Sequence, residues 1–186
     1  MLTHKGTQRL ETPRLYLRRA CREDAMPMFR NWASDPKVTR FLTWPTYQSV
    51  EAAYPVLAMW EKSYRNPDFY HWMIVLKELG EPIGSISVVR LDDTTETAEI
   101  GYCIGKPWWH QGLTAEALQA VMEYLFRQVG VNRIEAKHDI NNPNSGAVMR
   151  KCGMQYEGTA RASARNNQGI CDTVHYGILR SDWILK

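Results

Sequence analysis

The feature that most constrains the fold is the stretch Gly101–Ala117, where an apolar strand pattern gives way almost at once to a helical pattern. The strand pattern ends at Ile104, and the helical pattern starts at Leu113, directly after Gly112. The first N–H groups of a helix have no partner inside the helix, and the helix dipole adds partial positive charge there. Gly112 has no Cβ, so a bound group can approach its backbone closely. The stretch therefore predicts an α/β fold with a phosphate-type anion site at this turn.

Composition is that of an ordinary folded protein. With 186 residues, 44% of them hydrophobic, the chain predicts a single domain over residues 1–186 with its core at about 10–183. The net charge is +3 and the basic residues are dispersed, which argues against direct nucleic-acid binding. No stretch approaches the ~20 apolar residues of a membrane span, and Met1–Arg9 lacks the apolar run of a signal peptide. We expect a cytoplasmic protein with no membrane partner.

Cysteines and histidines give no sign of a metal site. No cysteine pair has CxxC spacing, and no histidine lies near a cysteine at ligand spacing. We therefore expect no metal and single reduced thiols. The residues concerned are Cys21, Cys103, Cys152, Cys171, His4, His71, His110, His138 and His175.

Alternating apolar residues and turn signals predict a mixed sheet of about seven strands flanked by helices. The expected strands are Leu10–Arg18, Tyr70–Lys77, Pro82–Leu91, Thr97–Ile104, Asn132–His138, Gln155–Arg161 and Ile170–Leu179. Short turns make the second to fourth strands antiparallel, whereas the helix after Gly112 makes the next pair parallel. The expected helices are Arg22–Trp32, Pro36–Leu42, Val50–Tyr64 after a Ser49 cap, Leu113–Gln128 ended by Gly130, and one from Pro143 capped by Asn142.

Several segments in this order resemble the GNAT acetyltransferase family. The segment Trp109–Thr114 aligns with the family's acetyl-CoA signature, although Trp109 stands where Gln or Arg is usual and Thr114 where Gly or Ala is usual. The sequence is similar to the RimJ/RimL-type branch, which acetylates protein N-terminal amines, over nearly the whole chain. The segments that carry the similarity are Leu10–Leu15, Ala98–Tyr102, Thr114–Leu118, Asn142–Ser145, Lys151–Met154 and Leu179–Trp183.

The resemblance implies a GNAT acyl-CoA N-acyltransferase fold, acetyl-CoA as cosubstrate and direct attack by an amine in a ternary complex. It also implies that the strand ending at Ile104 separates from the next strand, so that backbone groups near Cys103 and Ile104 bind the pantetheine arm. Glu116, in the first helical turn, must then point away from the phosphates. The expected cosubstrate-binding residues are Cys103, Ile104, Trp109, His110, Gln111, Gly112, Leu113, Thr114, Ala115 and Asn142.

Two catalytic candidates follow, each with a plainer alternative. In RimL-like enzymes the residue that matches Ser145 protonates the departing thiolate, but a serine at this position can instead bond its own helix. Glu99 is the candidate base, through a water, and the alternative is a strand glutamate paired with a nearby cation. Asn142 can bind the pantetheine arm or cap its helix. Cys103 has no histidine spaced to activate it, so we expect no cysteine nucleophile.

The acceptor is predicted to be an α-amine. Neutralising a lysine of pKa ~10.4 at pH 7 costs about 4.6 kcal/mol, against about 1 kcal/mol for an α-amine of pKa ~7.8. The absence of an evident strong base therefore favours a peptide or protein N-terminus. A small amine (antibiotic, polyamine or amino acid) and a non-catalytic CoA-binding module remain as alternatives, and a homodimer is compatible with either. Trp44 and Tyr176 are the expected acceptor-binding residues.

Overall fold

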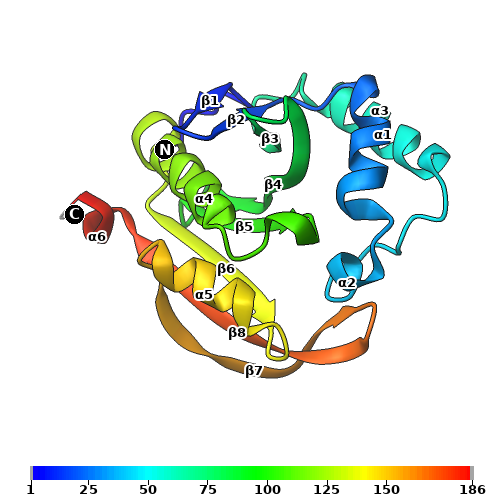
Figure 1. The fold of residues 1–186 in the computed structure, drawn as a ribbon. Coiled ribbons are helices and arrows are strands. Elements are labelled where there is room, and N and C mark those ends of the chain that lie inside the picture. Colours follow the sequence, from blue (N-terminus) through cyan, green and yellow to red (C-terminus); the bar gives the residue numbers. More distant parts are fainter. Residues whose placement is uncertain (1, 185–186) are drawn as a thin grey trace.

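The computed structural model describes residues 2–184, and the two ends of the expected 1–186 domain lie outside this part. The described strands form one eight-stranded sheet in the order β1-β2-β3-β4-β5-β6-β8-β7 (Figure 1). Every neighbouring pair is antiparallel except β5–β6, which confirms the mixed sheet. The strands are β1 Leu10–Glu11, β2 Leu15–Arg18, β3 His71–Leu76, β4 Glu81–Asp92, β5 Thr97–Ile104, β6 Arg133–Asp139, β7 Gln155–Asn166 and β8 Gly169–Leu179.

The sheet has eight strands rather than about seven because the first expected strand, 10–18, divides into β1 and β2. These two strands pair with each other antiparallel, with Leu10 opposite Leu17. Pro13 has no N–H to donate to a neighbouring strand, and the Leu15 N–H donates to the Thr12 hydroxyl at 3.0 Å. The prediction of one continuous strand was wrong because this turn chemistry interrupts it.

The helices lie where the sequence predicts them, but several begin or end in a different kind of turn. Val50–Ala52 is a 3-10 turn before α3, and the Ser49 side chain makes no capping bond, so that expectation was wrong. Gly130 does end its helix in the left-handed conformation, with φ 88°. No helix within 2–184 has the length and hydropathy to span a bilayer. The α-helices are α1 Ala25–Met28, α2 Pro36–Thr39, α3 Ala53–Ser63, α4 Leu113–Tyr124, α5 Pro143–Lys151 and α6 Arg180–Ile184; shorter turns are η1 Arg22–Asp24, η2 Phe29–Ala33, η3 Val50–Ala52, η4 Lys106–Trp108 and η5 Leu125–Val129.

Two hydrophobic clusters cover the two faces of the sheet. Side chains alternate along β3, so Trp72 and Ile74 join the cluster under α4, whereas Met73 and Val75 join the cluster under α1 and α3. The helix layers are seen on opposite sides of the strands in Figure 1. Strands that are buried on both faces read as apolar runs, which explains the unbroken apolar sequence of β3.

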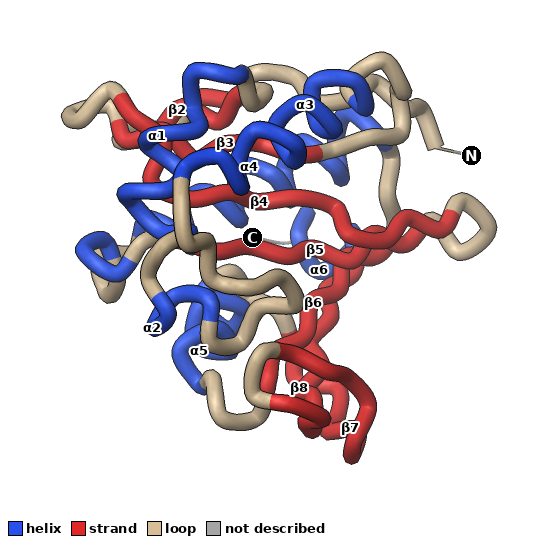
Figure 2. Tube along the Cα trace, turned by 90° about the vertical axis from the view of Figure 1, so that its right-hand side faces the viewer, coloured by secondary structure: helices blue, strands red, loops and turns tan. Residues whose placement is uncertain are grey.

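The sheet opens between β5 and β6. The two strands pair only at the start, from Thr97 opposite Arg133 to Glu99 opposite Glu135. Beyond Glu99, β5 continues beside β4 while β6 turns away with β8 and β7, as Figure 2 shows. This separation is the one that the resemblance implied, and it leaves one edge of β5 without a neighbouring strand.

Candidate active site

A cavity of about 1100 Å³ occupies the opening between β5 and β6 and continues under α1–α3. Single small-molecule sites usually measure roughly 300–1,000 Å³, so this volume suits two reactants side by side. Its lining includes these predicted site residues: Trp44, Glu99, Cys103, Ile104, Trp109, His110, Gly112, Thr114, Ala115, Asn142 and Ser145. Gln111, Leu113 and Tyr176 do not line it.

The turn before α4 presents a row of unused donors. The first α-helical bond runs from the Glu116 N–H to the Gly112 carbonyl at 3.0 Å. Within the described residues, no protein group accepts a hydrogen bond from the backbone N–H groups of residues 110–115. His110 and Gly112 both have positive φ, 60° and 76°, which curls the chain so that successive N–H groups converge. The turn is therefore free to bind a diphosphate.

Charge around Gly112 also suits an anion. A Cβ at Gly112 would lie 3.2 Å from the Lys151 Nζ and 3.7 Å from an Arg14 guanidinium nitrogen, so two cations flank the turn. Glu116 points away, as required: its carboxylate accepts from the Thr12 hydroxyl at 2.6 Å and from the Arg14 Nε at 2.7 Å. Burial by itself raises the pKa of the Glu116 carboxyl. The hydrogen bonds together lower that pKa by a larger amount, so it lies below its ordinary value. The carboxylate is thus held away from the phosphate position.

Trp109 connects this turn to the end of β5. Its indole N–H donates to the Ile104 carbonyl at 2.9 Å, and its ring packs against both hydrophobic clusters. Cys103, the preceding strand residue, lies 3.6 Å from the Ser85 hydroxyl through its sulfur. Burial raises the pKa of the Cys103 thiol, so it stays protonated at neutral pH. This agrees with a strand edge that binds through its backbone rather than a cysteine that attacks.

Ser145 and Tyr102 meet across the opening. The Ser145 hydroxyl donates to the Tyr102 hydroxyl at 3.1 Å, and the Tyr102 hydroxyl donates to the Ser145 carbonyl at 2.9 Å. Ser145 therefore does not bond its own helix through its side chain, contrary to the plainer alternative. Burial raises the pKa of Tyr102 well above its usual range, so the phenol keeps its proton. The pair places two hydroxyl groups on the cavity wall beside the unpaired part of β5.

The start of α5 lies against β6, with Asn142 at its cap position and Pro143 as its first residue. The Asn142 side chain makes no capping hydrogen bond, so it remains available to a ligand. A Cβ at Gly146 would lie only 2.5 Å from the His138 Nε2, so the close approach of α5 to β6 requires glycine there. His138 Nδ1 donates to the Asp139 carbonyl at 2.8 Å, and burial lowers the pKa of this imidazole, which is therefore neutral.

Glu99 lies on the cavity wall in an ion-pair network. Its carboxylate oxygens lie 2.9 Å from the Lys137 Nζ and 3.6 Å from the Arg90 Nε. The side chain is 12% exposed. This is the paired arrangement given above as the alternative to a base, so the role of Glu99 in proton transfer stays a hypothesis.

Three predicted residues lie outside the cavity lining. Tyr176 is buried, stacks on His138 with ring centroids 5.8 Å apart, and accepts a hydrogen bond from the Arg150 guanidinium at 2.8 Å. Leu113 is a core residue of α4. The Gln111 carbonyl accepts from Arg14 at 3.0 Å, so this residue supports the turn from behind.

The part of the cavity under α1–α3 has an aromatic wall. Trp60 stacks on His71 with centroids 3.8 Å apart, and Trp44 packs on Tyr47 at 5.3 Å. The sequence singled out only Trp44 among these residues. Trp60 and His71 were missed because each belongs to a pattern that reads as ordinary core. From the sequence, Tyr102 and Lys151 were named only as members of segments that match the family. Their place in those segments was the signal that could have identified them as site residues.

The tip of the β7–β8 hairpin closes over this aromatic part. Asn167 makes three hydrogen bonds to the end of α2 and the segment after it: its N–H donates to the Leu42 carbonyl at 3.1 Å, and its side chain donates to the Thr39 and Trp44 carbonyls, each at 2.8 Å. We call this set of contacts the Asn167 bridge. It joins two segments that are 123 or more residues apart in sequence.

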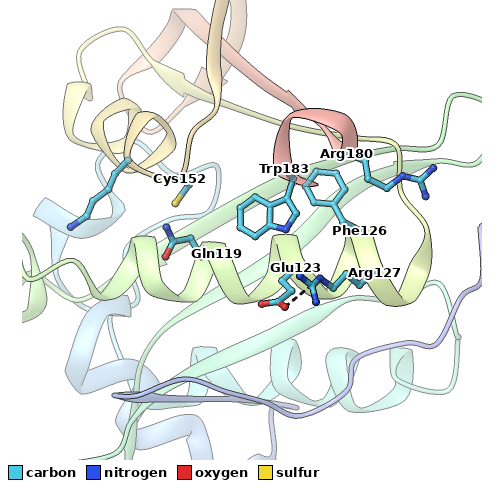
Figure 3. A pocket seen from close by; sticks show the side chains of 8 residues that line it. Gln119, Glu123, Phe126, Arg127, Cys152, Arg180 and Trp183 are labelled. Carbon is cyan, nitrogen blue, oxygen red and sulfur yellow. Dashed lines mark ion pairs between the residues drawn. The ribbon is translucent and has the colours of Figure 1, made fainter. Parts of the chain in front are cut away.

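A second cavity, of about 660 Å³, lies where α4 and η5 face α6 and the end of α5 (Figure 3). Its lining includes neither the free edge of β5 nor the N–H groups of residues 110–115. Lys151 is the residue that the two linings share. Its lining is Gln119, Glu123, Phe126, Arg127, Lys151, Cys152, Arg180 and Trp183. Residues 2–184 hold no group of three or more side chains suited to bind a metal ion.

Comparison with known proteins agrees with this geometry. The model of the acetyltransferase (GNAT) domain matches residues 14–155. The chain is 30% identical over 174 residues to a Bacillus licheniformis protein named uncharacterized N-acetyltransferase p20, covering 94% of this chain and 97% of that protein. It is 27% identical over 135 residues to the ribosomal-protein-serine acetyltransferase of Escherichia coli (strain K12), covering 73% and 75% of the two chains.

Among solved structures, the microcin C7 self immunity acetyltransferase MccE, in complex with acetyl-CoA and AMP, superposes with a TM-score of 0.80. The superposition covers 90% of this chain and 93% of that chain at 20% identity. At this identity the likeness concerns the fold.

Proposed function

This chain belongs to the GNAT family and is an acetyl-CoA-dependent N-acetyltransferase, and on that premise we propose that it acetylates an α-amine, in the first place the N-terminus of a peptide or protein. The observation that carries the proposal is the row of unused N–H groups at 110–115 beside the free edge of β5. These donors and Lys151 suit the diphosphate, and the strand edge suits the pantetheine arm, which delivers the acetyl group as a thioester. The relative from Escherichia coli is named for ribosomal-protein serine.

In the proposed reaction the residues of this chain position the two reactants and assist two proton transfers. One proton goes to the leaving thiolate, and the other leaves the attacking amine. The Ser145 hydroxyl, which donates to the Tyr102 hydroxyl in the structure, would turn to give its proton to the leaving thiolate beside the unpaired part of β5. Tyr102 orients that hydroxyl and stays protonated itself. A CoA thiol leaves readily at neutral pH, so the contribution of Ser145 is moderate. Glu99, through a water, is the candidate to take the proton of the attacking amine.

A small α-amine is a second candidate acceptor, and the Asn167 bridge is the observation that favours it. The bridge spans the aromatic part of the cavity from the hairpin to the segment after α2. A cross-link at this place narrows access to the cavity, which suits a free small molecule best and a flexible N-terminus next. Both acceptors share an α-amino group, and in a peptide its pKa near ~7.8 means that it needs little help to lose its proton.

Incubation of the protein with acetyl-CoA and pools of amines, followed by thiol release and product mass, tests the proposal. We expect acetylated α-amines and little reaction at lysine side chains. A separate measurement covers the cosubstrate: CoA at a hundredfold excess over its Kd should stabilise the fold by about 2.7 kcal/mol. Stabilisation without any acetylated amine would support a binding module instead, and absence of stabilisation would remove the proposed diphosphate site.

A further inference from the structure

The acceptor half of the cavity has a chemistry of its own, which rests on the proposed function and narrows it. We propose that this half selects an α-amine that stands beside an aromatic ring and a negatively charged group, as in an aromatic amino acid or a peptide that begins with an aromatic residue followed by an acidic one. Three observations carry this proposal: the aromatic wall, the cations without an ion pair at the mouth, and carboxylates that are already held by other groups of the protein.

The aromatic wall lies on the α1–α3 face of the sheet. Trp32 is fully buried beneath it, and Trp60 and His71 present stacked rings to the cavity. In the strand register His71 lies opposite Ser87, and Ser87 lies opposite Gly101 on β5. His71 is thus two strands, roughly 10 Å, from the free edge where the acetyl group is proposed to lie. An α-amine at that edge can place its own ring against Trp60.

His71 adds one polar position to this wall. The Tyr64 hydroxyl donates to the His71 carbonyl at 3.2 Å, so its oxygen must accept the 3.3 Å hydrogen bond from His71 Nδ1. Burial lowers the pKa of His71 to about 3, so the ring is neutral and its Nε2 carries a lone pair. The wall therefore contributes no positive charge, and it suits a ring or a neutral donor rather than an ammonium group.

The mouth of this half is cationic. Lys37 on α2, Arg40 directly after α2 and Arg165 on β7 line the cavity and are exposed. None of the three forms an ion pair with another described residue. The Asn167 bridge brings α2 and the end of β7 together, so the three charges surround one opening. An anionic group on the acceptor would be attracted here, and a polyamine would be repelled.

Neither carboxylate of the cavity lining is open to the acceptor. Among the described residues that line the cavity, the carboxylates are Glu99 and Asp139. Glu99 is paired with Lys137 and Arg90. Asp139 is buried and accepts hydrogen bonds from the Asn141 N–H at 2.8 Å and the Asn166 side chain at 2.7 Å. A cationic tail on the acceptor would therefore find no free partner in the cavity.

Four tripeptides and one amino acid test the proposal with the full chain and acetyl-CoA. The peptides are Phe-Glu-Gly, Phe-Lys-Gly, Ala-Glu-Gly and Ala-Lys-Gly, which vary the ring and the charge independently. We expect kcat/KM to rise at least about tenfold with the ring, from apolar burial, and roughly threefold to tenfold with the acidic residue. Free phenylalanine shows whether the preferred acceptor is an amino acid or a peptide.

Two variants with matched controls assign these effects to the residues named. Trp60→Leu should remove most of the ring preference, whereas Trp183→Leu, a half-buried tryptophan in the second cavity, should keep it. Arg40→Ala and Arg165→Ala should remove the charge preference, whereas Arg161→Ala, an exposed arginine of β7 outside the lining, should keep it. Equal rates for all four peptides would overturn this inference alone, whereas CoA binding without acetylation of any amine would overturn the proposed function.

Discussion

The two halves of the cavity are built in different ways. The half that we propose binds the cosubstrate comes mainly from one continuous stretch, β5 to α4, and offers backbone N–H groups and a free strand edge. The acceptor half comes from distant segments, α1 to β3 and the β7–β8 hairpin, and offers side chains. Backbone geometry tolerates many sequences, whereas a wall of side chains changes with each substitution. The difference teaches that the activity class and the acceptor are encoded in separate parts of the chain.

The strongest test of the backbone-built half is Gly112→Ala. We expect CoA binding to weaken by about a hundredfold in calorimetry, because the added Cβ meets Lys151 and blocks close approach to the N–H groups. Gly130→Ala is the matched control, since Gly130 has φ 88° but no atom within 4 Å of its Cβ position. Both variants carry backbone strain, so equal CoA affinities in the two would break the comparison.

The next largest effect concerns stability, and it belongs to the acceptor half. The pKa of His71 falls to about 3 in the folded protein from its ordinary 6.5. Above pH 6.5 both states are neutral; as pH falls below 6.5 the unfolded chain binds a proton that the folded chain refuses until about pH 3, so stability decreases. From pH 7 to pH 5 this amounts to about 2 kcal/mol. Urea unfolding should show this loss in the native chain and in His110→Asn, but much less of it in His71→Asn.

A smaller effect is expected where the two halves meet. Ser145→Ala should lower kcat about tenfold with CoA affinity unchanged, because the thiolate loses a proton donor that it needs only moderately. Glu99→Gln should lower kcat less than about threefold for an α-amine, since this carboxylate is already paired with Lys137 and Arg90. Single-turnover kinetics would measure both. A larger loss for Glu99→Gln than for Ser145→Ala would identify Glu99 as the base.

A small effect, on acceptor binding alone, should come from the Asn167 bridge. Asn167→Ala removes the two side-chain hydrogen bonds to the Thr39 and Trp44 carbonyls. Each bond contributes about 1 kcal/mol to holding the two segments together, and we expect about half of the total, about 1 kcal/mol, to reach acceptor binding. The KM for an acceptor peptide should then change by about fivefold, while CoA affinity stays constant. Gln168→Ala in the same hairpin turn is the control. A change in CoA affinity instead would mean that the bridge supports the whole cavity.

The sequence predicted much of the fold because the relevant signals are local. The alternation in β5, the glycine before α4 and the Asn142-Pro143 start of α5 each fix their own segment, and the structure has each where expected. The turn that divides the first strand has a local part, Pro13 and the Thr12 hydroxyl, and a distant part, Glu116, which accepts from the Arg14 N–H from 102 residues away. A local pattern does not contain that contact.

The site residues also divide into those that a local sequence signal identifies and those that only the folded structure brings together. Gly112 and Ser145 were found because they belong to motifs with contiguous spacing. Trp60 and His71 read as core from the sequence, and only the folding of α3 onto β3 makes them a cavity wall. Tyr176 was expected near the acceptor but is covered by His138 and Arg150, since the strand pattern fixes its face of the sheet and not what covers it.

We expect Trp109 to make binding at the two halves interdependent. Its ring touches both hydrophobic clusters, and its N–H fixes the diphosphate turn to the end of β5. An acceptor that tightens the aromatic side therefore also steadies the turn, and linkage requires the cosubstrate to raise acceptor affinity by the same factor. Cooperative binding of the two reactants would follow from a single indole ring, with no movement of a domain.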